Sequence, residues 1–300
     1  MPRSIHKGLI ANKLPRKTLL KQNLEKTNIE KAHEEFTIDR PVITELDSKK
    51  PPKFKNDLEI QPIKTQRDGV ELLPIQKEGI LPAMGTMVIC ASTGGGKSVM
   101  ICNLLAKKNM LKGFYDRIVV FCLSPCPILE DTLKLKKEDI IKEDKPELMR
   151  DILTKQKELI KTKGFKKAPK ILLLLDDIAQ SKTFLKSEVL TELFFASTHA
   201  KVSVWVATQS YTQLPRRIRI NCHWMIIFNG VRRSELDRLA DEYESPFLTK
   251  KEFYNMVKYA TAEPYSFLAI NNTASDRTTQ FRKNFSTILR LNKDRDMTNL

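Results

Sequence analysis

Residues 87–98, Met-Val-Ile-Cys-Ala-Ser-Thr-Gly-Gly-Gly-Lys-Ser, are the stretch that decides the fold. Residues 87–90 are apolar and predict a short buried strand. Residues 91–98 fit A-x-x-x-x-G-K-S, one residue away from the phosphate-binding loop G-x-x-x-x-G-K-[ST]. The residues after Ser98 have a helical pattern. The order of strand, glycine-rich loop and helix is the context that a phosphate-binding loop requires.

Each residue type in this loop suits the chemistry of a polyphosphate. Gly94, Gly95 and Gly96 let successive backbone N–H groups turn inward, and the helix that follows points its partial positive charge at the same place. Lys97 adds a full charge at the β/γ-phosphates, and the Ser98 hydroxyl is suited to Mg²⁺. The residues expected to contact the nucleotide are Ser92, Thr93, Gly94, Gly95, Gly96, Lys97, Ser98 and Val99.

Length and composition set the class of protein. The 300 residues leave room for one large domain or two small ones, and a hydrophobic content of 41% suffices for a packed core. The net charge of +16 favours an anionic partner, most simply nucleic acid, although a solvated lysine-rich surface also explains part of it. No apolar stretch approaches the ~20 residues of a membrane span. No apolar segment of the kind found in a secretory signal follows the first residues.

Five cysteines form no C-x-x-C pair, and several fall in apolar strand or helix patterns. We therefore expect free, buried thiols in a reducing compartment. A zinc site built from Cys122, Cys126, Cys222 and His223 matches no familiar ligand spacing, so we do not expect one.

The chain divides into three parts. Residues 1–31 carry eight Lys and Arg against two Glu, which indicates a flexible or loosely helical basic arm that contacts DNA or a partner, or simply a solubilising tail. We assign residues 1–60 to this basic arm and its connection, 61–290 to the core, and 291–300 to a basic tail. Residues 61–82 are expected to wrap the edge of the sheet.

The core alternates strand and helix patterns. Expected strands lie at 117–123, 171–175, 202–209, 224–228 and 265–270, and residues 278–285 are expected to pair with the last of these as a hairpin. Expected helices lie at 97–108, 187–198, 232–242 and 249–259, and the lysine-rich stretch 128–163 is helical in pattern, with Leu148, Ile152 and Ile160 on one face. Strands that are apolar on both sides need cover on both faces, which a parallel sheet with crossover helices provides. The fold class is therefore α/β, three-layered and doubly wound.

Polar residues end two of these strands. Asp176 and Asp177 follow the apolar run 171–175, so they belong at the carboxyl edge of the sheet, where the glycine loop also lies. Asp176, together with Ser98, is expected to hold Mg²⁺, and Asp177 to orient or deprotonate the attacking water. Gln209 ends the next strand and is expected to contact the γ-phosphate or that water.

Arginines cluster downstream, at 216, 217, 219, 232 and 233. In a ring of subunits, an arginine offered to the neighbour's γ-phosphate stabilises charge in the transition state. Arg233 and Arg219 are the two candidates for this role. Surface ion pairs or contacts with the DNA backbone are the alternative for either of them.

Three segments taken together carry a family resemblance: Ala-Ser-Thr-Gly-Gly-Gly-Lys-Ser at 91–98, Ile-Leu-Leu-Leu-Leu-Asp-Asp at 171–177, and Val-Ala-Thr-Gln-Ser-Tyr-Thr-Gln-Leu-Pro-Arg-Arg-Ile-Arg-Ile-Asn-Cys at 206–222. They resemble the genome-packaging ATPases of large DNA viruses and virophages, poxvirus type, within the FtsK–HerA class. The third segment is the most specific. The resemblance covers about residues 85–272.

The resemblance implies a RecA-like P-loop fold of the ASCE type, an oligomeric ring of five or six copies, and ATP with Mg²⁺ as cofactors. It also implies double-stranded DNA pulled into a preformed capsid, contacts with a capsid vertex or with capsid and membrane proteins, and a location in the host cytoplasm or the virion. Lys97, Ser98, Asp176 and Gln209 match family positions, whereas Asp177 stands where many relatives have Glu. Arg233 precedes Ser-Glu-Leu-Asp much as an arginine does in the FtsK branch, and alanine in place of the first loop glycine is a departure that still permits ATP binding.

The sequence thus predicts an ATP hydrolase coupled to DNA translocation. A helicase or DNA-transfer coupling ATPase of the same superfamily is one alternative. A non-catalytic protein that binds nucleic acid or capsid and keeps a nucleotide fold is another, which the intact set of Lys, Ser, paired Asp and Gln argues against. A metabolic kinase is disfavoured because no arginine-rich lid or acceptor pocket is recognisable.

Overall fold

The computed structural model describes residues 73, 76, 80–81, 84–178, 181–245 and 247–291. The helices in these ranges are α3 (Lys97–Ala106), α4 (Pro127–Leu133), α5 (Glu147–Lys163), α6 (Lys182–Lys186), α7 (Glu188–Ala196), α8 (Arg216–Arg219), α9 (Arg233–Tyr243) and α10 (Lys250–Ala260). The strands are β1 (Thr86–Cys90), β2 (Arg117–Cys122), β3 (Ile140–Ile141), β4 (Ile171–Asp176), β5 (Val202–Thr208), β6 (Trp224–Phe228), β7 (Phe267–Asn271), β8 (Phe281–Lys283) and β9 (Thr287–Ile288). Short 3-10 turns η2 (Lys137–Asp139), η3 (Phe165–Lys167), η5 (Ser197–Ala200) and η6 (Arg277–Thr279) connect some of them.

The strands form one sheet in the order β3-β2-β4-β5-β1-β6-β7-β8-β9. The first six in this order run parallel. β7, β8 and β9 continue the sheet by antiparallel pairing. Every residue of β1, β5 and β6 is buried, which requires helices on both faces and crossover connections between the strands. The expected mostly parallel sheet is confirmed, and so is the hairpin at its end.

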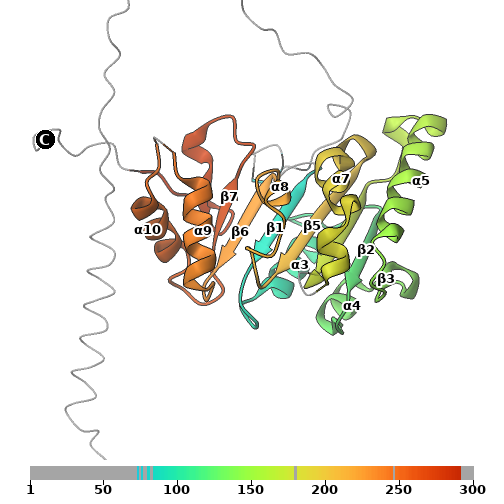
Figure 1. Ribbon diagram of the computed structural model, residues 1–300. Helices are drawn as coiled ribbons and strands as arrows, with labels where there is room; N and C mark the ends of the chain where they lie inside the picture. The colour runs from blue at the N-terminus through green and yellow to red at the C-terminus, as the bar shows by residue number, and fades with distance from the viewer. Residues whose placement is uncertain are drawn as a thin grey trace, which may run out of the picture. The chain divides into compact units, whose positions relative to one another are not determined.

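Helices cover both faces of this sheet (Figure 1). On one face, Ile101 of α3 and Leu129 of α4 belong to a core cluster that includes Ile89 and Leu174 of the strands. In Figure 1, α5, α7, α8 and α9 lie in front of the sheet, on its other face. The three-layer α/β architecture expected from the sequence is therefore confirmed.

The lysine-rich stretch 128–163 is not continuously helical, contrary to our expectation. α4 ends where Lys134 adopts a left-handed backbone, with φ 51°. Ile140–Ile141 forms β3 beside β2, because a β-branched pair fits the edge of a sheet better than a helix. α5 begins only after Pro146, which is tolerated at a helix start and not in a helix interior.

The buried face of α5 also differs from the expected one by about one position. The expected residues Leu148, Ile152 and Ile160 are only half-buried. The buried residues of α5 are Met149, Leu153 and Gln156.

Other expectations fall partly outside the described residues. Residues 1–60 lie outside them, as does the 291–300 tail apart from its first residue. Of the segment expected to wrap the sheet edge, Leu81 is buried in the core cluster, and Leu73 and Ile80 pack against that cluster. All five cysteines are buried and free of disulfide bonds, as predicted. Within the described ranges, no helix combines the length and apolar character needed to cross a membrane.

Candidate nucleotide site at the carboxyl edge of the sheet

The sheet brings three sequence-predicted segments to the same edge. β1, β5 and β4 are neighbours, and all three run parallel. Cys90 is in register with Thr208, and Asp176 with Ala207, so the three strands end at nearly the same level. The glycine loop, the two aspartates and Gln209 therefore leave the sheet side by side.

The glycine loop has the backbone that its residue types predict. Gly94 and Gly96 have φ of 73° and 101°, a region that favours glycine. Ala91 is not among the residues with positive φ, and its N–H donates to the Thr208 carbonyl at 3.2 Å, so the alanine simply continues the strand. The buried Lys97 ammonium donates to the Ala91 carbonyl at 3.2 Å, across the mouth of the loop.

The N-terminus of α3 is open to an anion. Gly96 caps this ten-residue helix without a side-chain hydrogen bond, and its first turn carries no acidic residue. The first N–H groups of a helix have no partner within the helix, and they carry partial positive charge. This helix start, the glycine backbone and the Lys97 charge together form a cradle for phosphate groups.

Side chains from all three segments are linked by hydrogen bonds. Thr93 Oγ1 donates to Gln209 Oε1 at 2.7 Å, and Gln209 Nε2 donates to Asp177 Oδ2 at 2.8 Å. Asp177 has φ 52°, a left-handed conformation that aspartate adopts more readily than most residues, and its N–H donates to the Ala207 carbonyl. The loop, the strand-end amide and the second aspartate thus form one continuous polar chain.

Asp176 occupies a different environment from its neighbour. The pKa of Asp176 is raised to about 6: burial is the main cause and the Asp177 charge adds to it, while the Lys97 charge opposes the rise. A half-buried carboxylate beside a second acid carries negative charge that a divalent cation would offset. The residues present therefore fit a Mg²⁺ ion, with Asp176 and the half-buried Ser98 as the expected oxygen ligands.

Two further contacts shape the loop. A Cβ on Gly230, which has φ +80°, would lie 2.6 Å from Ser92 Oγ, so the segment after β6 packs closely against the glycine loop. A Cβ on Gly96 would lie 3.1 Å from a ring carbon of Tyr265 and 3.4 Å from one of Phe228. Glycine at these positions permits both approaches.

An apolar groove opens beside the cradle, and sequence reasoning missed it. It holds about 390 Å³ and is lined by Gly96, Val99, Asn103, Phe228, Tyr265 and Phe285, among others. Tyr265 is 71% exposed and has φ 61°, an unusual backbone for an aromatic residue. Several aromatic residues near the end of the core are the one feature of the sequence that hints at this groove. Its other walls come from segments far apart in the sequence, so pattern alone does not predict it.

The two candidate arginines have opposite environments. Arg233 begins α9 with a side chain that is 74% exposed; its Nε lies 2.7 Å from Asp237 Oδ1, and its guanidinium covers the Tyr254 ring at 4.4 Å. Arg219 is 7% exposed, and its Nη2 lies 2.5 Å from Glu242 Oε1. Arg219 also donates from Nη1 to the carbonyls of Leu214 and Thr212.

The role expected for Arg219 is therefore corrected. Its guanidinium is buried, paired with a carboxylate and bound to two carbonyls within its own chain, so it is not available to a neighbouring subunit. A buried ion pair of this kind fixes the packing of α8 against α9.

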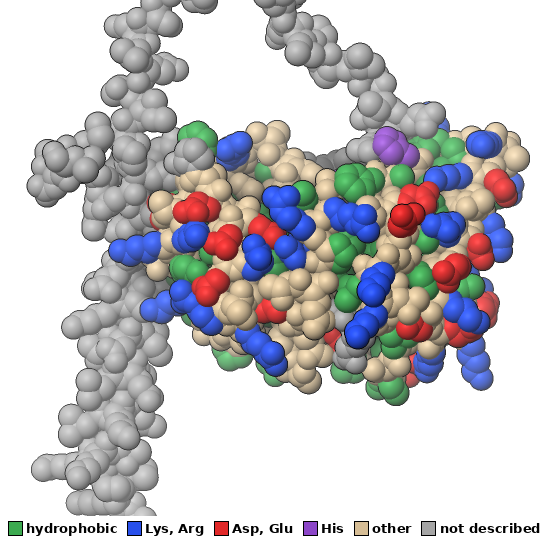
Figure 2. Space-filling model, viewed as in Figure 1, with side chains coloured by type: hydrophobic (Ala, Val, Ile, Leu, Met, Phe, Trp, Pro, Cys, Tyr) green, Lys and Arg blue, Asp and Glu red, His purple; other side chains and the backbone are tan. Residues whose placement is uncertain are grey.

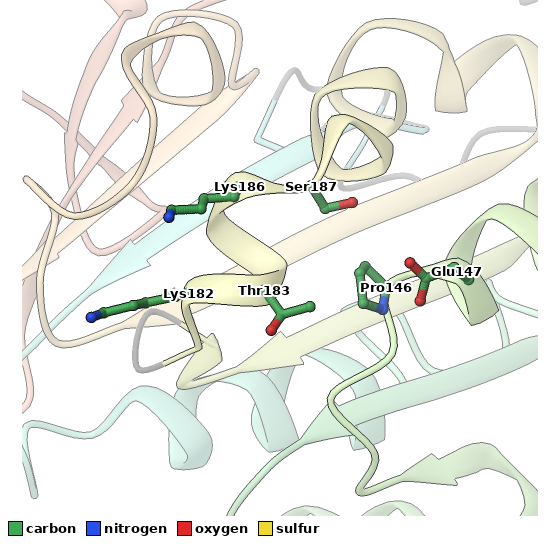
Figure 3. A pocket seen from close by; sticks show the side chains of 6 residues that line it. All are labelled: Pro146, Glu147, Lys182, Thr183, Lys186 and Ser187. Atoms are coloured by element: carbon green, nitrogen blue, oxygen red, sulfur yellow. The ribbon is translucent and has the colours of Figure 1, made fainter.

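Two other features lie away from the cradle. A hollow of about 400 Å³ is lined by Pro146, Glu147, Lys182, Thr183, Lys186 and Ser187, and Figure 3 shows both lysine side chains pointing away from it. It contains no residue of the glycine loop.

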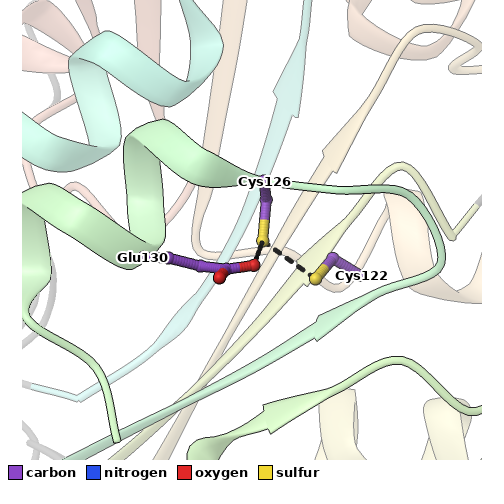
Figure 4. Close-up of side chains that lie close together, drawn as sticks. All are labelled: Cys122, Cys126 and Glu130. Atoms are coloured by element: carbon purple, nitrogen blue, oxygen red, sulfur yellow. Dashed lines mark hydrogen bonds between the residues drawn. The ribbon is translucent and has the colours of Figure 1, made fainter. Parts of the chain in front are cut away.

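Cys122, Cys126 and Glu130 form the other feature (Figure 4). The two sulfurs are 2.9 Å apart, whereas a tetrahedral zinc ion with bonds of about 2.3 Å would separate them by roughly 3.8 Å. Cys222 and His223 do not belong to this group. Within the described residues, the fold therefore does not bring together the four residues weighed as a zinc site in the sequence.

The mostly parallel sheet and the glycine loop at its carboxyl edge place this chain in the class of P-loop proteins with a RecA-like fold. Residues 75–281 match the family described as Poxvirus A32 protein, and the chain belongs to that family. The resemblance to viral packaging ATPases that the motifs carry is thereby confirmed. No curated protein matches the chain.

Several solved structures are similar to this one. The DNA-packaging ATPase B204 from Sulfolobus turreted icosahedral virus is 16% identical over 62% of this chain and 92% of its own, with a TM-score of 0.46. The genome packaging NTPase B204 from Sulfolobus turreted icosahedral virus 2, in complex with ATP-gammaS, is 16% identical over 64% of this chain and 93% of its own, with a TM-score of 0.46. ATPases 2 and 3 of Thermomonospora curvata EccC are 15% identical over 71% of this chain and 37% of theirs, with a TM-score of 0.43.

Replacing Arg219 by methionine should destabilise the fold strongly. It leaves Glu242 buried without its cation, which costs about 3–5 kcal/mol. Arg216→Met, on the exposed side of the same helix, should change the free energy of unfolding by no more than about 0.5 kcal/mol. Chemical denaturation of the three chains measures both values, and equal effects for the two variants would contradict the structural role.

Replacing Asp176 by asparagine should stabilise the nucleotide-free chain at high pH. Because the pKa of Asp176 is raised from 3.8 to about 6, its charged form is disfavoured by folding, and this cost is full above about pH 6 and absent below pH 3.8. We expect Asp176→Asn to raise the free energy of unfolding by about 1–3 kcal/mol at pH 8, with the gain shrinking as the pH falls towards 4. Thermal unfolding at several pH values tests this, and a gain independent of pH would argue against it.

Proposed function

We propose that this protein is an ATP hydrolase that translocates double-stranded DNA and packages a viral genome into a preformed capsid. The observation that carries the proposal is the hydrogen-bonded chain from Thr93 through Gln209 to Asp177, on the same rim as the Lys97 cradle. Phosphate binding alone requires only the cradle. Hydrolysis requires in addition a group that contacts the γ-phosphate, here Gln209, and an acid that orients and deprotonates water, here Asp177.

Each side chain has a role in this proposal. Lys97 and the backbone of residues 92–98 hold the β- and γ-phosphates. Ser98 and Asp176 would hold Mg²⁺, which when bound offsets the charge that the phosphates carry. Asp177 orients the attacking water and accepts its proton, and Gln209 contacts the γ-phosphate or that water. The groove beside Gly96, with Tyr265 and Val99 on its walls, receives the base.

Arg233 is the arginine that we retain for a role between subunits. Its guanidinium is exposed and, among the residues that the structure describes, contacts the Asp237 carboxylate and the Tyr254 ring at the surface, so it can exchange these partners for a phosphate oxygen. In this proposal the copies form a ring, and Arg233 of one subunit completes the site of the next. Hydrolysis then depends on assembly.

The charge of the chain suits a DNA partner. The net charge is +16, and residues 1–31 contribute eight Lys and Arg against two Glu. On the face shown in Figure 2, Lys and Arg side chains alternate with Asp and Glu and form no single-sign patch. Arg282 is buried and donates to the Phe285 carbonyl, so we do not assign it a contact with DNA. Contacts with the DNA backbone should weaken steeply with salt.

Family membership favours packaging over the alternatives. A helicase or coupling ATPase would share the same cradle, so the site does not distinguish it from a packaging ATPase. The action on DNA does: a helicase separates the strands, whereas a packaging ATPase moves along an intact duplex. A non-catalytic protein has no use for the linked Gln209 and Asp177.

The purified chain should hydrolyse ATP, and duplex DNA should stimulate the reaction. Lys97→Ala should lower turnover by about 100-fold or more because it removes the charge at the phosphates. Lys108→Ala, an exposed lysine just after the same helix, serves as the control and should leave turnover unchanged. Turnover with and without duplex, beside the assembly mass, tests the proposal, and a chain that ignores ATP would overturn it.

A mixing experiment tests the arginine. Lys97→Ala subunits keep a functional Arg233, and Arg233→Ala subunits keep a functional cradle. Each variant alone should be inactive, with the arginine variant about 10³-fold below wild type. Their mixture should regain part of the turnover, whereas Arg238→Ala on the same helix should stay active. Absence of recovery at every ratio would show that Arg233 does not act across an interface.

A further inference from the structure

The segment that follows Gln209 is fastened to helix α9 by a buried glutamate. Glu235 is 6% exposed and lies in the first turn of α9. Its Oε1 accepts from Ser210 Oγ at 2.8 Å and from Thr212 Oγ1 at 2.9 Å, and its Oε2 accepts from the Thr212 N–H at 2.6 Å. A carboxylate that accepts three hydrogen bonds from one short segment holds that segment in one position.

A second glutamate fastens the same segment at the other end of α9. Glu242 accepts from the Tyr211 hydroxyl and from Arg219, and Arg219 in turn donates to the Thr212 and Leu214 carbonyls. Both contacts are buried or nearly so. Residues 210–214 and α9 are therefore joined along the length of the helix, and they are expected to move as one body.

Gln209 and Arg233 lie at the two ends of this body. We assign Gln209 to the nucleotide site of its own subunit and Arg233 to the site of the neighbouring subunit. Gln209, immediately before Ser210, is hydrogen-bonded to the glycine loop and to Asp177. Arg233, two residues before Glu235, is exposed at the start of α9. The path from the cradle of one subunit to the arginine offered to its neighbour thus consists of hydrogen bonds and two residues of helix α9.

We propose that Glu235 is a positioning residue that couples the nucleotide state read by Gln209 to the position of Arg233. When the γ-phosphate is lost, Gln209 and the segment after it shift, and Glu235 transfers that shift to α9. The nucleotide in one subunit then regulates hydrolysis in the next. This inference rests on the proposed function, and coupling of this kind requires an element that both sites bias.

The test is hydrogen exchange of the full chain with a non-hydrolysable ATP analogue and with ADP. In wild type, exchange in residues 209–212 and in α9 should differ between the two nucleotides by about fivefold or more. In Glu235→Ala, the difference should persist in 209–212 and vanish in the first turn of α9, whereas the far end of α9, still held through Glu242, should keep part of it. The coupling is overturned if the exchange of α9 responds to the nucleotide equally in wild type and in Glu235→Ala. It is also overturned if residues 209–212 respond while α9 responds in neither protein. If neither nucleotide protects residues 93–98 of wild type, the proposed function itself fails, and this inference with it.

Turnover separates positioning from mere stability. Glu235→Ala should lower kcat by about tenfold with KM for ATP within about twofold, because its own cradle is intact. Glu235→Gln, which can still bond Ser210 and Thr212, should restore most of kcat. Ser210→Ala removes one bond without touching α9 and should give a smaller loss of the same kind.

Glu252→Ala is the matched control, since Glu252 is also a buried glutamate in the first turn of a helix, α10, and bonds Thr249 there. It should alter thermal stability but leave the α9 response in place. If Glu252→Ala abolishes the α9 response as Glu235→Ala does, the effect is one of stability, and Glu235 has no positioning role.

Discussion

Main-chain pairing between β1 and β5 is the interaction on which the rest of the site depends. It sets Cys90 beside Thr208 and lets the Ala91 N–H reach the Thr208 carbonyl, so the glycine loop leaves the sheet next to Gln209. β4 pairs with the other side of β5 and delivers the two aspartates to the same rim. All three strands are buried on both faces, so a shift of register by one residue would turn every side chain of the strand into the opposite core layer and would also displace the strand end that carries the site.

The sequence could predict the features that local pattern encodes. A parallel strand buried on both faces is a continuous apolar run, and the polar residue that ends it lies at the carboxyl edge by topology alone. Asp176 and Gln209 each follow from this rule, without any knowledge of which strands are neighbours, whereas Lys97 follows from the phosphate-loop motif. The positive φ of Gly94 and Gly96 follows equally from residue type.

Contacts between distant segments were beyond the reach of such reasoning. Glu235 and Glu242 look like ordinary acids of an amphipathic helix, yet both are buried against the segment after β5. The sequence made Arg219 a candidate for the role between subunits, because periodicity does not show which acid faces which base. The break at Ile140–Ile141 was missed for a related reason, since two isoleucines suit a helix or a strand until the exposed edge of β2 is known.

The outermost strands of the sheet limit how copies of this chain can join. β3 and β9, at its two margins, are only two residues long, and very short border strands are a common protection against edge-to-edge polymerisation. A neighbouring chain would gain at most a couple of main-chain bonds there. In the ring that we propose, cohesion between the described parts of neighbouring copies would therefore come from side chains, which separate and rejoin more readily than a continuous β ladder.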